Sequence, residues 1–380
     1  MNTGRILELD GLRTLAITAV LFFHYSPHPN LFRFGWTGVD LFFVISGFLI
    51  TGILLDLRSD RSPYRTFYWR RALRIFPPYY AVLAVVAVLA FVIHHEPFEA
   101  DQWFGCLFFV PAIRRGVHFG LILHRILGTA AFDLSSKPFF PPRYTYYSWD
   151  LYMYWSLIVE ELFYLLWAPV VLTASKRWIA ALALGSLVLC PCLRGLTHIV
   201  QFTEGIGFLT RFDSLAIGAC LSLLLRLRPR LSPGWLIAPI PILIAILIWL
   251  SVRCGVLAGR EVRSTELFAV CGYSVIALLG ACIVGLCVRC RGHRLLFPLR
   301  LRPMVYIGTI SYTMYLTHFL VYVGVARHVS GNLPRALVAA ALTVGIAALS
   351  WRYYESPLLR LRNWSPLADI RSRLAPASVD

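Results

Sequence analysis

Residues 9–24 read LDGLRTLAITAVLFFH, and the rest of the chain is best interpreted from this stretch. Residues 14–23 carry no charge, yet an arginine precedes them and a histidine follows them. In an α-helix the step from Arg13 to His24 is about three turns, so both side chains lie on nearly the same face, roughly 16 Å apart along the axis. Asp10 lies within about 40° of that face. Ionisable groups in a membrane helix are costly, so this stripe predicts a functional site.

The composition predicts an all-α integral membrane protein. The 380-residue chain is 58% hydrophobic and 14% charged, whereas soluble domains carry about 25% charged residues. Its mean hydropathy is +0.68. The formal net charge of +17 fits basic cytoplasmic loops better than nucleic-acid binding. The nine cysteines are scattered, and no histidine accompanies them at metal-ligand spacing, so we expect no metal site.

Ten apolar segments are long enough to cross a bilayer. They lie at 12–27, 37–57, 78–95, 151–172, 178–194, 206–226, 235–252, 267–289, 304–323 and 334–353. We expect a polytopic protein with about ten transmembrane helices, or eleven if 102–127 also crosses, and no soluble domain. Residues 1–365 then form a single membrane domain, and 366–380 a cytoplasmic tail.

The basic loops indicate an orientation with both termini in the cytoplasm. Arginines gather at 58–77 and 289–302, and the positive-inside rule places such loops in the cytoplasm of a multi-pass inner-membrane protein. Residues 96–150 are then external. Their aromatic, proline-rich part at 138–150 is typical of an interfacial belt, and it is also suited to holding an acceptor.

A second candidate group is the sequence FYWRRALRIFPP at 67–78. Arg71 and Arg74 lie on one side of a helical turn, with Arg70 beside them. Guanidinium groups bind phosphate with two parallel hydrogen bonds, so this cluster predicts a phosphate site. Ordinary anchoring at the cytoplasmic membrane surface is the alternative. We expect the two prolines at 77–78 to end the helix before the next span.

A third group is WSLIVEELFY at 155–164, which places two adjacent carboxylates in an apolar span. Neither Glu160 nor Glu161 can face lipid cheaply. Ser156, Glu160 and Tyr164 share a helix face at four-residue spacing. The group predicts a wall of the acceptor site.

The role of Glu160 has two readings. It orients the imidazole of His24, or it forms a salt bridge between helices with Arg13 or Arg211. Arg211 and His318 are two further polar residues in apolar segments, and we expect them to contact substrate rather than only to pack. The chain has no glycine-rich phosphate loop, nucleophile elbow or zinc-protease motif.

Taken together, these motifs resemble the membrane acyltransferase-3 family, also called the OafA/YrhL-like acyltransferases. The matching segments occur in the family's order and cover nearly the whole chain. They are LDGLRTLAITAVLFFH (9–24), GWTGVDLFFVISGFLIT (35–51), FYWRRALRIFPPYY (67–80), WSLIVEELFYLLW (155–167), RFDSLAIGACLS (211–222), ISYTMYLTHF (310–319) and YYESP (353–357).

The resemblance implies an integral membrane O-acyltransferase. Such enzymes move an acyl group, often acetyl, from cytoplasmic acyl-CoA to a hydroxyl of a glycan, a lipid-linked sugar or a small metabolite. The family's Arg-x10-His motif matches Arg13 and His24, and its Arg-x-x-Arg motif matches Arg71 and Arg74. Where many members have glutamine after the two glutamates, this chain has Leu162.

These expectations assign a role to each group. Arg70, Arg71 and Arg74 hold the CoA phosphates. His24 deprotonates the acceptor hydroxyl. In the alternative, His24 takes the acyl group first. Arg13, held by Asp10, stabilises negative charge. Ser156, Glu161, Arg211 and His318 contact the acceptor.

Two other functions also fit part of the pattern. A transporter of a small polar or acylated substrate would use polar groups near the midplane and a broken segment, but no inverted repeat is visible. A non-catalytic scaffold would leave the paired carboxylates and the Arg/His stripe without a reason.

The orientation leads to a first prediction. We expect cysteine labels or reporter fusions at Lys137 and Arg177 to report opposite sides of the membrane, because the basic loops place 96–150 outside. Labelling of both positions from the same side would contradict the ten-span topology.

Overall fold

A computed structural model describes residues 5–25, 34–89, 107, 154–199, 209–256, 267–326 and 328–363, and within these ranges the chain forms helices and no strand. The α-helices are α1 (Leu7–Tyr25), α2 (Thr37–Leu57), α3 (Pro63–Ala87), α6 (Trp155–Thr173), α7 (Lys176–Ile199), α8 (Phe212–Leu227), α9 (Gly234–Ile237), α10 (Pro239–Arg253), α11 (Tyr273–Arg289), α12 (Arg302–Ala326), α13 (Asn332–Ser350) and α14 (Ser356–Leu359). Short 3₁₀ or π turns flank them at η3 (Leu209–Arg211), η5 (Phe268–Gly272), η6 (Arg294–Arg300), η7 (Trp351–Glu355) and η8 (Arg360–Asn363).

Each of the ten predicted apolar segments contains a helix, which confirms the all-α class for the described part of the chain. Six continuous helical stretches there are long and apolar enough to cross a membrane. They are Thr37–Leu57, Trp155–Thr173, Lys176–Leu196, Gly234–Arg253, Phe268–Arg289 and Asn332–Leu359. The chain is therefore a multi-pass membrane protein. The number of ten or eleven spans stays a prediction, since α1 and α3 carry several charges and α8 has only 16 residues.

Two sequence predictions lie outside the described residues. These are the external stretch at 96–150, of which Leu107 alone is described, and the cytoplasmic tail at 366–380.

The helix break predicted at the two prolines is wrong. Helix α3 begins at Pro63 and continues through Pro77 and Pro78 to Ala87. The two prolines remove the backbone donors that would bind the carbonyls of Leu73 and Arg74, a loss that helices in membrane proteins tolerate where neighbouring helices pack on them. The hydroxyls of Tyr312 and Tyr354 donate to carbonyls in this stretch, at 3.1 Å from Ile75 O and 3.3 Å from Pro77 O.

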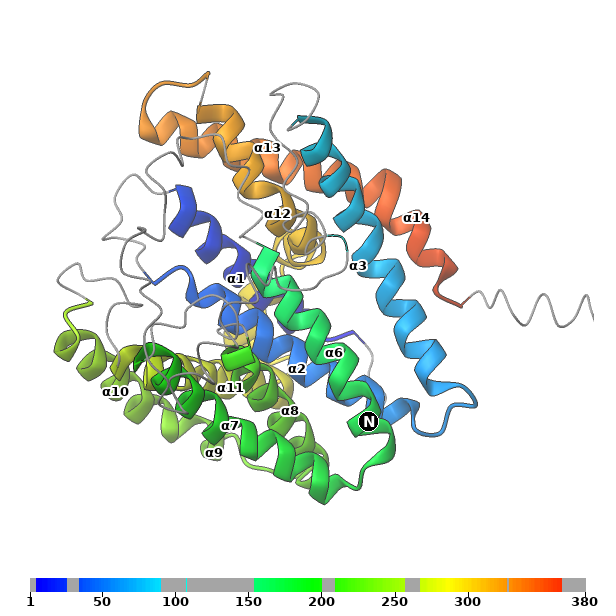
Figure 1. Ribbon diagram of the computed structural model, residues 1–380, viewed down its shortest axis with the longest axis vertical. Coiled ribbons are helices and arrows are strands. Elements are labelled where there is room, and N and C mark those ends of the chain that lie inside the picture. Colours follow the sequence, from blue (N-terminus) through cyan, green and yellow to red (C-terminus); the bar gives the residue numbers. More distant parts are fainter. Residues whose placement is uncertain are drawn as a thin grey trace, which may run out of the picture.

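Helix α2 lies in the middle of the bundle, where it packs against α8, α1, α11 and α6 (Figure 1). Its closest partner is α8, and glycines make that closeness possible. A Cβ atom added at Gly47 would overlap the carbonyl of Leu215, and one added at Gly218 would overlap the carbonyl of Val44. Small residues that let backbones touch are typical of helix pairs in membranes.

Helix α1 is held in the same way against α12. A Cβ atom at Gly308 would overlap the carbonyl of Asp10. The two helices run side by side from this contact, and α13 covers the other side of α12 (Figure 1). This pairing sets which residues of α12 face His24.

A buried ion pair joins α2 to the start of α8. The guanidinium of Arg211 donates to Asp40, and the hydroxyl of Ser214 donates to the same oxygen at 3.0 Å. Asp40 is fully buried and Arg211 is 7% exposed. The guanidinium also lies 3.7 Å from the ring centre of Tyr273, a cation–π contact with α11.

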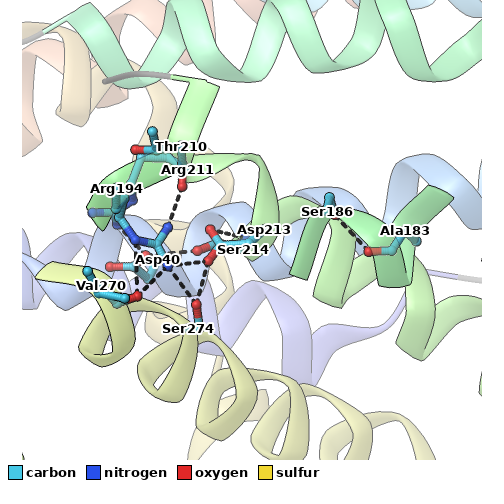
Figure 2. A network of polar contacts seen from close by, with 10 residues as sticks. All are labelled: Asp40, Ala183, Ser186, Arg194, Thr210, Arg211, Asp213, Ser214, Val270 and Ser274. Carbon is cyan, nitrogen blue, oxygen red and sulfur yellow. Dashed lines mark hydrogen bonds and ion pairs between the residues drawn. The ribbon is translucent and has the colours of Figure 1, made fainter. Parts of the chain in front are cut away.

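A second buried pair lies beside the first (Figure 2). Arg194 of α7 donates to Asp213 at 2.8 Å and to the carbonyl of Val270 at 2.9 Å. Ser274 donates to the same Asp213 oxygen at 2.6 Å. The two pairs tie α2, α7, α8 and α11 together by charges that lipid could not satisfy.

These pairs lead to a prediction on stability. Asp40→Asn keeps the side-chain shape but leaves Arg211 buried without its counter-charge, so we expect a loss of about 3–5 kcal/mol. The loss is measured as a lower midpoint of thermal unfolding in detergent.

The matched control lies on the same helix. Asp56→Asn breaks the ion pair with Arg226. The side chain of Asp56 is 39% exposed, and that of Arg226 is 25% exposed. Such a pair contributes about 0–1 kcal/mol. Equal destabilisation by the two variants would show that the buried pair does not hold the bundle.

Candidate functional site

The first turns of α1 hold the predicted Asp10–Arg13 pair. Arg13 donates to Asp10 at 3.1 Å, and Arg5 donates to the other carboxylate oxygen at 2.6 Å. Arg5 also donates to the hydroxyl of Thr309 on α12 at 2.6 Å. Asp10 is 6% exposed, so one buried carboxylate fixes two guanidiniums at this end of the α1–α12 pair.

Arg71 and Arg74 lie one turn apart on α3, as their spacing predicts, while Arg70 is exposed. The guanidinium of Arg71 lies 5.2 Å from the ring centre of Tyr164 on α6. Within the described part of the chain, neither Arg71 nor Arg74 forms an ion pair with a carboxylate. Both cations are half-buried, and neither is held in an ion pair by a described carboxylate.

Arg74, which lies outside the candidate membrane spans, is also close to other cations. Burial, together with the positive charges of Arg13 and Arg71, lowers the pKa of Arg74 to about 10. The carboxylates of Glu355 and Asp10 act in the opposite direction, more weakly. Arg74 still carries its charge near neutral pH, so three guanidiniums from α1 and α3 gather at one place. A bound anion would relieve their repulsion.

Glu355, one of those carboxylates, belongs to the π turn η7. It is 6% exposed and accepts hydrogen bonds from Thr313 of α12 at 2.7 Å and from Ser350 at 2.9 Å. These two hydrogen bonds fix the Glu355 carboxylate, which is close enough to Arg74 to act on it electrostatically.

Glu160 does not contact the residues that the sequence suggested. Its carboxylate accepts hydrogen bonds from the hydroxyls of Ser46 on α2 and Tyr164 on its own helix. The predicted contact with His24 is not formed, and the alternative salt-bridge partners are bound elsewhere, Arg13 to Asp10 and Arg211 to Asp40. Helical spacing correctly predicts the Tyr164 contact but contains no information on which helix lies opposite.

Glu161 lies on the α3 side of α6. It is half-buried, and the charge of Arg71 is close enough to act on it. Both Glu160 and Glu161 also act electrostatically on Tyr312 of α12. The two carboxylates, Arg71 and Tyr312 thus form a polar layer between α3, α6 and α12.

Ser156 lies one turn before Glu160 and joins α6 to α12. Its hydroxyl is 2.6 Å from the hydroxyl of Tyr315. Both side chains are buried. His318 follows Tyr315 about one turn later on α12.

His24 is half-buried near the end of α1, and its tautomer is defined by its contact. Nδ1 lies 2.9 Å from the carbonyl oxygen of Val20. A carbonyl can only accept, so Nδ1 of the neutral ring carries the hydrogen and Nε2 keeps its lone pair. The backbone of its own helix, rather than Glu160, therefore sets the tautomer of this ring.

His318 is the residue that the structure brings to His24. The two ring centres are 5.0 Å apart, with an interplanar angle of 53°. His318 has no exposed surface. Arg211, by contrast, lies in the buried ion pair with Asp40, with its guanidinium 5.8 Å from the ring centre of Trp155 at the start of α6.

Sequence reasoning missed Asp40, Arg194 and Ser46. The signal for the first two was present, because each is a charged residue inside an apolar segment. Ser46 had no signal, since a lone serine in a membrane helix is common. No group of three or more metal-binding side chains is found within the described ranges.

Comparisons with known proteins show the family to which the chain belongs. A family described as an acyltransferase domain matches residues 6–354. The peptidoglycan O-acetyltransferase OatA of Listeria monocytogenes is 28% identical over 370 residues, which cover 92% of this chain and 55% of that protein. The O-acetyltransferase OatA of Staphylococcus aureus is 26% identical over 376 residues, covering 92% of this chain and 56% of that protein.

The chain thus spans about half the length of these curated relatives. No solved structure matches it significantly. Because the family match includes Asp10, Arg13, His24 and the arginines of α3 in one continuous alignment, the chain belongs to the membrane acyltransferase-3 family.

Proposed function

We propose that this protein is a membrane O-acetyltransferase that moves an acetyl group from cytoplasmic acyl-CoA to a hydroxyl of a glycan. One observation carries the proposal: α1 has a cluster of guanidiniums near its first turns and a histidine with a free Nε2 lone pair near its end. The family match covers both ends.

The donor end is supported by the unpaired charges of α3. Arg71 and Arg74 lack an ion-pair carboxylate within the described chain, and Arg13 adds a third positive charge. Guanidiniums bind phosphate oxygens with paired, charge-assisted hydrogen bonds. The phosphates of CoA would therefore lie here, with exposed Arg70 at the edge of the site.

The distance along α1 fits a donor with a long arm. Arg13 and His24 are roughly 16 Å apart on the same helix. In acyl-CoA the phosphates and the thioester are at opposite ends of the pantetheine arm. A molecule held by its phosphates at the arginines thus extends its thioester toward His24.

The chemical step uses the lone pair of His24. Nε2 takes the proton of the acceptor hydroxyl, whose oxygen attacks the thioester carbonyl. The new oxygen–carbon bond forms, the carbon–sulfur bond breaks, and the proton moves from Nε2 to the sulfur of CoA. The Val20 carbonyl holds Nδ1–H throughout, so the ring keeps the tautomer that the step requires.

The acceptor class rests on the relatives. One is named a peptidoglycan O-acetyltransferase, and we extend the glycan hydroxyl, not the particular glycan, to this chain. The half-buried Glu160 and Glu161 offer polar groups for a sugar on the α6 side of the site, while the buried Ser156 joins this part of α6 to Tyr315.

The proposal is tested by mass spectrometry of glycans, lipids and small metabolites from cells with and without the gene. We expect one species to lose an acetyl increment when the gene is removed and to regain it on complementation. Unchanged acylation of all three fractions, together with no release of CoA from acetyl-CoA by purified protein, would reject it.

The donor site leads to a prediction on binding. Arg71→Ala and Arg74→Ala should each weaken acetyl-CoA binding by roughly 10- to 100-fold, because charge-assisted hydrogen bonds to phosphate are lost. Lysine at either position should rescue binding only in part, since an ammonium cannot form the paired contact. The measurement is calorimetry or tracer binding in nanodiscs.

Arg177→Ala is the control, because it removes an exposed positive charge at the start of α7. It should leave donor affinity unchanged. If the Arg71/Arg74 double alanine variant binds as well as the Arg177 variant, the arginines of α3 are membrane anchors.

His24 leads to a prediction on turnover. His24→Ala should lower acetyl transfer by about two to four orders of magnitude, the usual contribution of a general base. His24→Gln keeps a hydrogen-bonding group but cannot take a proton near neutral pH, so it should be equally inactive. Both variants should still bind acetyl-CoA, because the arginines are untouched. Near-normal transfer by well-folded His24→Gln protein would end the general-base assignment.

A further inference from the structure

His318 carries a buried polar atom that has no partner. Its Nδ1 lies 2.7 Å from the carbonyl of Tyr315, so Nδ1 carries the hydrogen and Nε2 holds a lone pair. The side chain is fully buried, and Nε2 forms no hydrogen bond with any described residue. An unpaired buried acceptor costs about 1–3 kcal/mol, so its retention calls for a reason.

The position of His318 is fixed from two other helices. Tyr25, the residue after His24 on α1, donates its hydroxyl to the carbonyl of His318 at 2.7 Å. The same hydroxyl is 2.9 Å from Thr343 of α13, and the Tyr25 ring stacks on Tyr322 with a centroid distance of 4.9 Å. Adjacent residues of α1 therefore present one imidazole and anchor the other.

The two rings lie beside each other, with their centres 5.0 Å apart and an interplanar angle of 53°. Each Nδ1–H is bound to a carbonyl of its own helix, so neither ring can offer a hydrogen to the other. Both Nε2 atoms therefore keep a lone pair, and a proton taken up by the Nε2 of His24 has the unpartnered Nε2 of the adjacent His318 ring as an acceptor.

Within the described chain, aromatic side chains surround the two imidazoles. Phe23 and Phe319 pack against the His24 ring, and Tyr25 and Tyr315 pack against the His318 ring. On the α13 side, the hydroxyl of Thr343 contacts the hydroxyl of Tyr25. No carboxylate or guanidinium within the described ranges acts on either ring.

We propose that His318 is a positioning residue that acts through His24, with its Nε2 accepting a hydrogen bond from the protonated His24 during transfer. This inference rests on the proposed role of His24 as the base. The acceptor proton moves to His24 Nε2, where the new N–H donates to the lone pair of His318 Nε2. When the carbon–sulfur bond breaks, the same proton passes from His24 to the CoA sulfur, and His318 returns to its starting state.

The burial of His318 supports this role over direct contact with a substrate. A fully covered side chain has no surface to offer the acceptor, whereas the adjacent His24 keeps part of its surface exposed. A buried acceptor behind a catalytic imidazole stabilises the imidazolium and orients the ring, as the carboxylate does in hydrolase triads.

Two amides of similar chemistry separate this role from a structural one. His318→Gln places its amide near the position of Nε2 and so keeps an acceptor that can face His24. His318→Asn places its amide near the position of Nδ1, where it keeps the contact to the Tyr315 carbonyl but offers nothing to His24. His318→Gln thus loses the contact with the Tyr315 carbonyl, and His318→Asn loses the acceptor that can face His24.

The assay is release of CoA from acetyl-CoA by full-length protein in nanodiscs, supplied with the total glycan and lipid extract of the host cells as acceptor. We expect His318→Asn to lower kcat about 100-fold and His318→Gln to retain at least about a tenth of the wild-type kcat. The KM for acetyl-CoA should be unchanged in both variants, because the arginines proposed to bind the CoA phosphates lie near the opposite end of α1 from His24 and His318.

Equal or better turnover by the Asn variant would overturn the proposal, since the Tyr315 contact would then be the one that matters. Loss of thermal stability in the Asn variant without a kcat effect would overturn it as well. His24→Gln in the same assay distinguishes this from failure of the proposed function, because an active His24→Gln protein rejects the base itself, whatever the His318 variants do.

Discussion

A charged side chain in the apolar interior of a membrane protein must find its partner within the protein, because lipid offers none. Most of the chain obeys this constraint. Asp40 with Arg211, Asp213 with Arg194, and Asp10 with Arg13 each satisfy a charge across or along helices. These pairs determine which helices lie beside α2 and α1.

The exceptions to this constraint are informative. Arg71 and Arg74 have no ion-pair partner, and the Nε2 of His318 has no hydrogen-bond partner, within the described chain. Both of these groups border α1, one near its beginning and the other near its end, whereas the other buried polar atoms without a hydrogen-bond partner in the described chain belong to ion-paired residues, namely Asp40, Arg211 and Arg300. Groups that a fold leaves unsatisfied at a cost are the groups that a substrate or a reaction intermediate can satisfy.

Sequence patterns were sufficient for the helices and for the faces of single helices. The hydrophobic run of α2 predicts both of its ends, and four-residue spacing predicts the contact of Glu160 with Tyr164. Contacts between helices were harder, because periodicity within one helix does not specify its neighbour. The contact of Glu160 with Ser46, in place of the expected contact with His24, was for that reason not predictable from the sequence pattern.

The continuation of α3 through two prolines was also not predictable from local rules. A Pro-Pro pair removes two backbone donors and usually ends a helix in water. Here the helix is long, and the hydroxyls of Tyr312 and Tyr354 bind carbonyls next to the prolines from outside the helix. The pairing of His24 with His318 likewise depends on the contact between Gly308 and Asp10, which no motif contains.

Helix α1 carries both ends of the proposed site, so its length sets the distance between them. Its rise of about 1.5 Å per residue fixes the separation between the arginine cluster and His24, and no loop can stretch it. A thioester without a phosphate-bearing arm of matching length would reach either the arginine cluster or His24 and leave the other site empty. Insertion of a single residue between Arg13 and His24 would lengthen this separation by only about 1.5 Å but would rotate one side chain by about 100° relative to the other, so the two would no longer share a helix face.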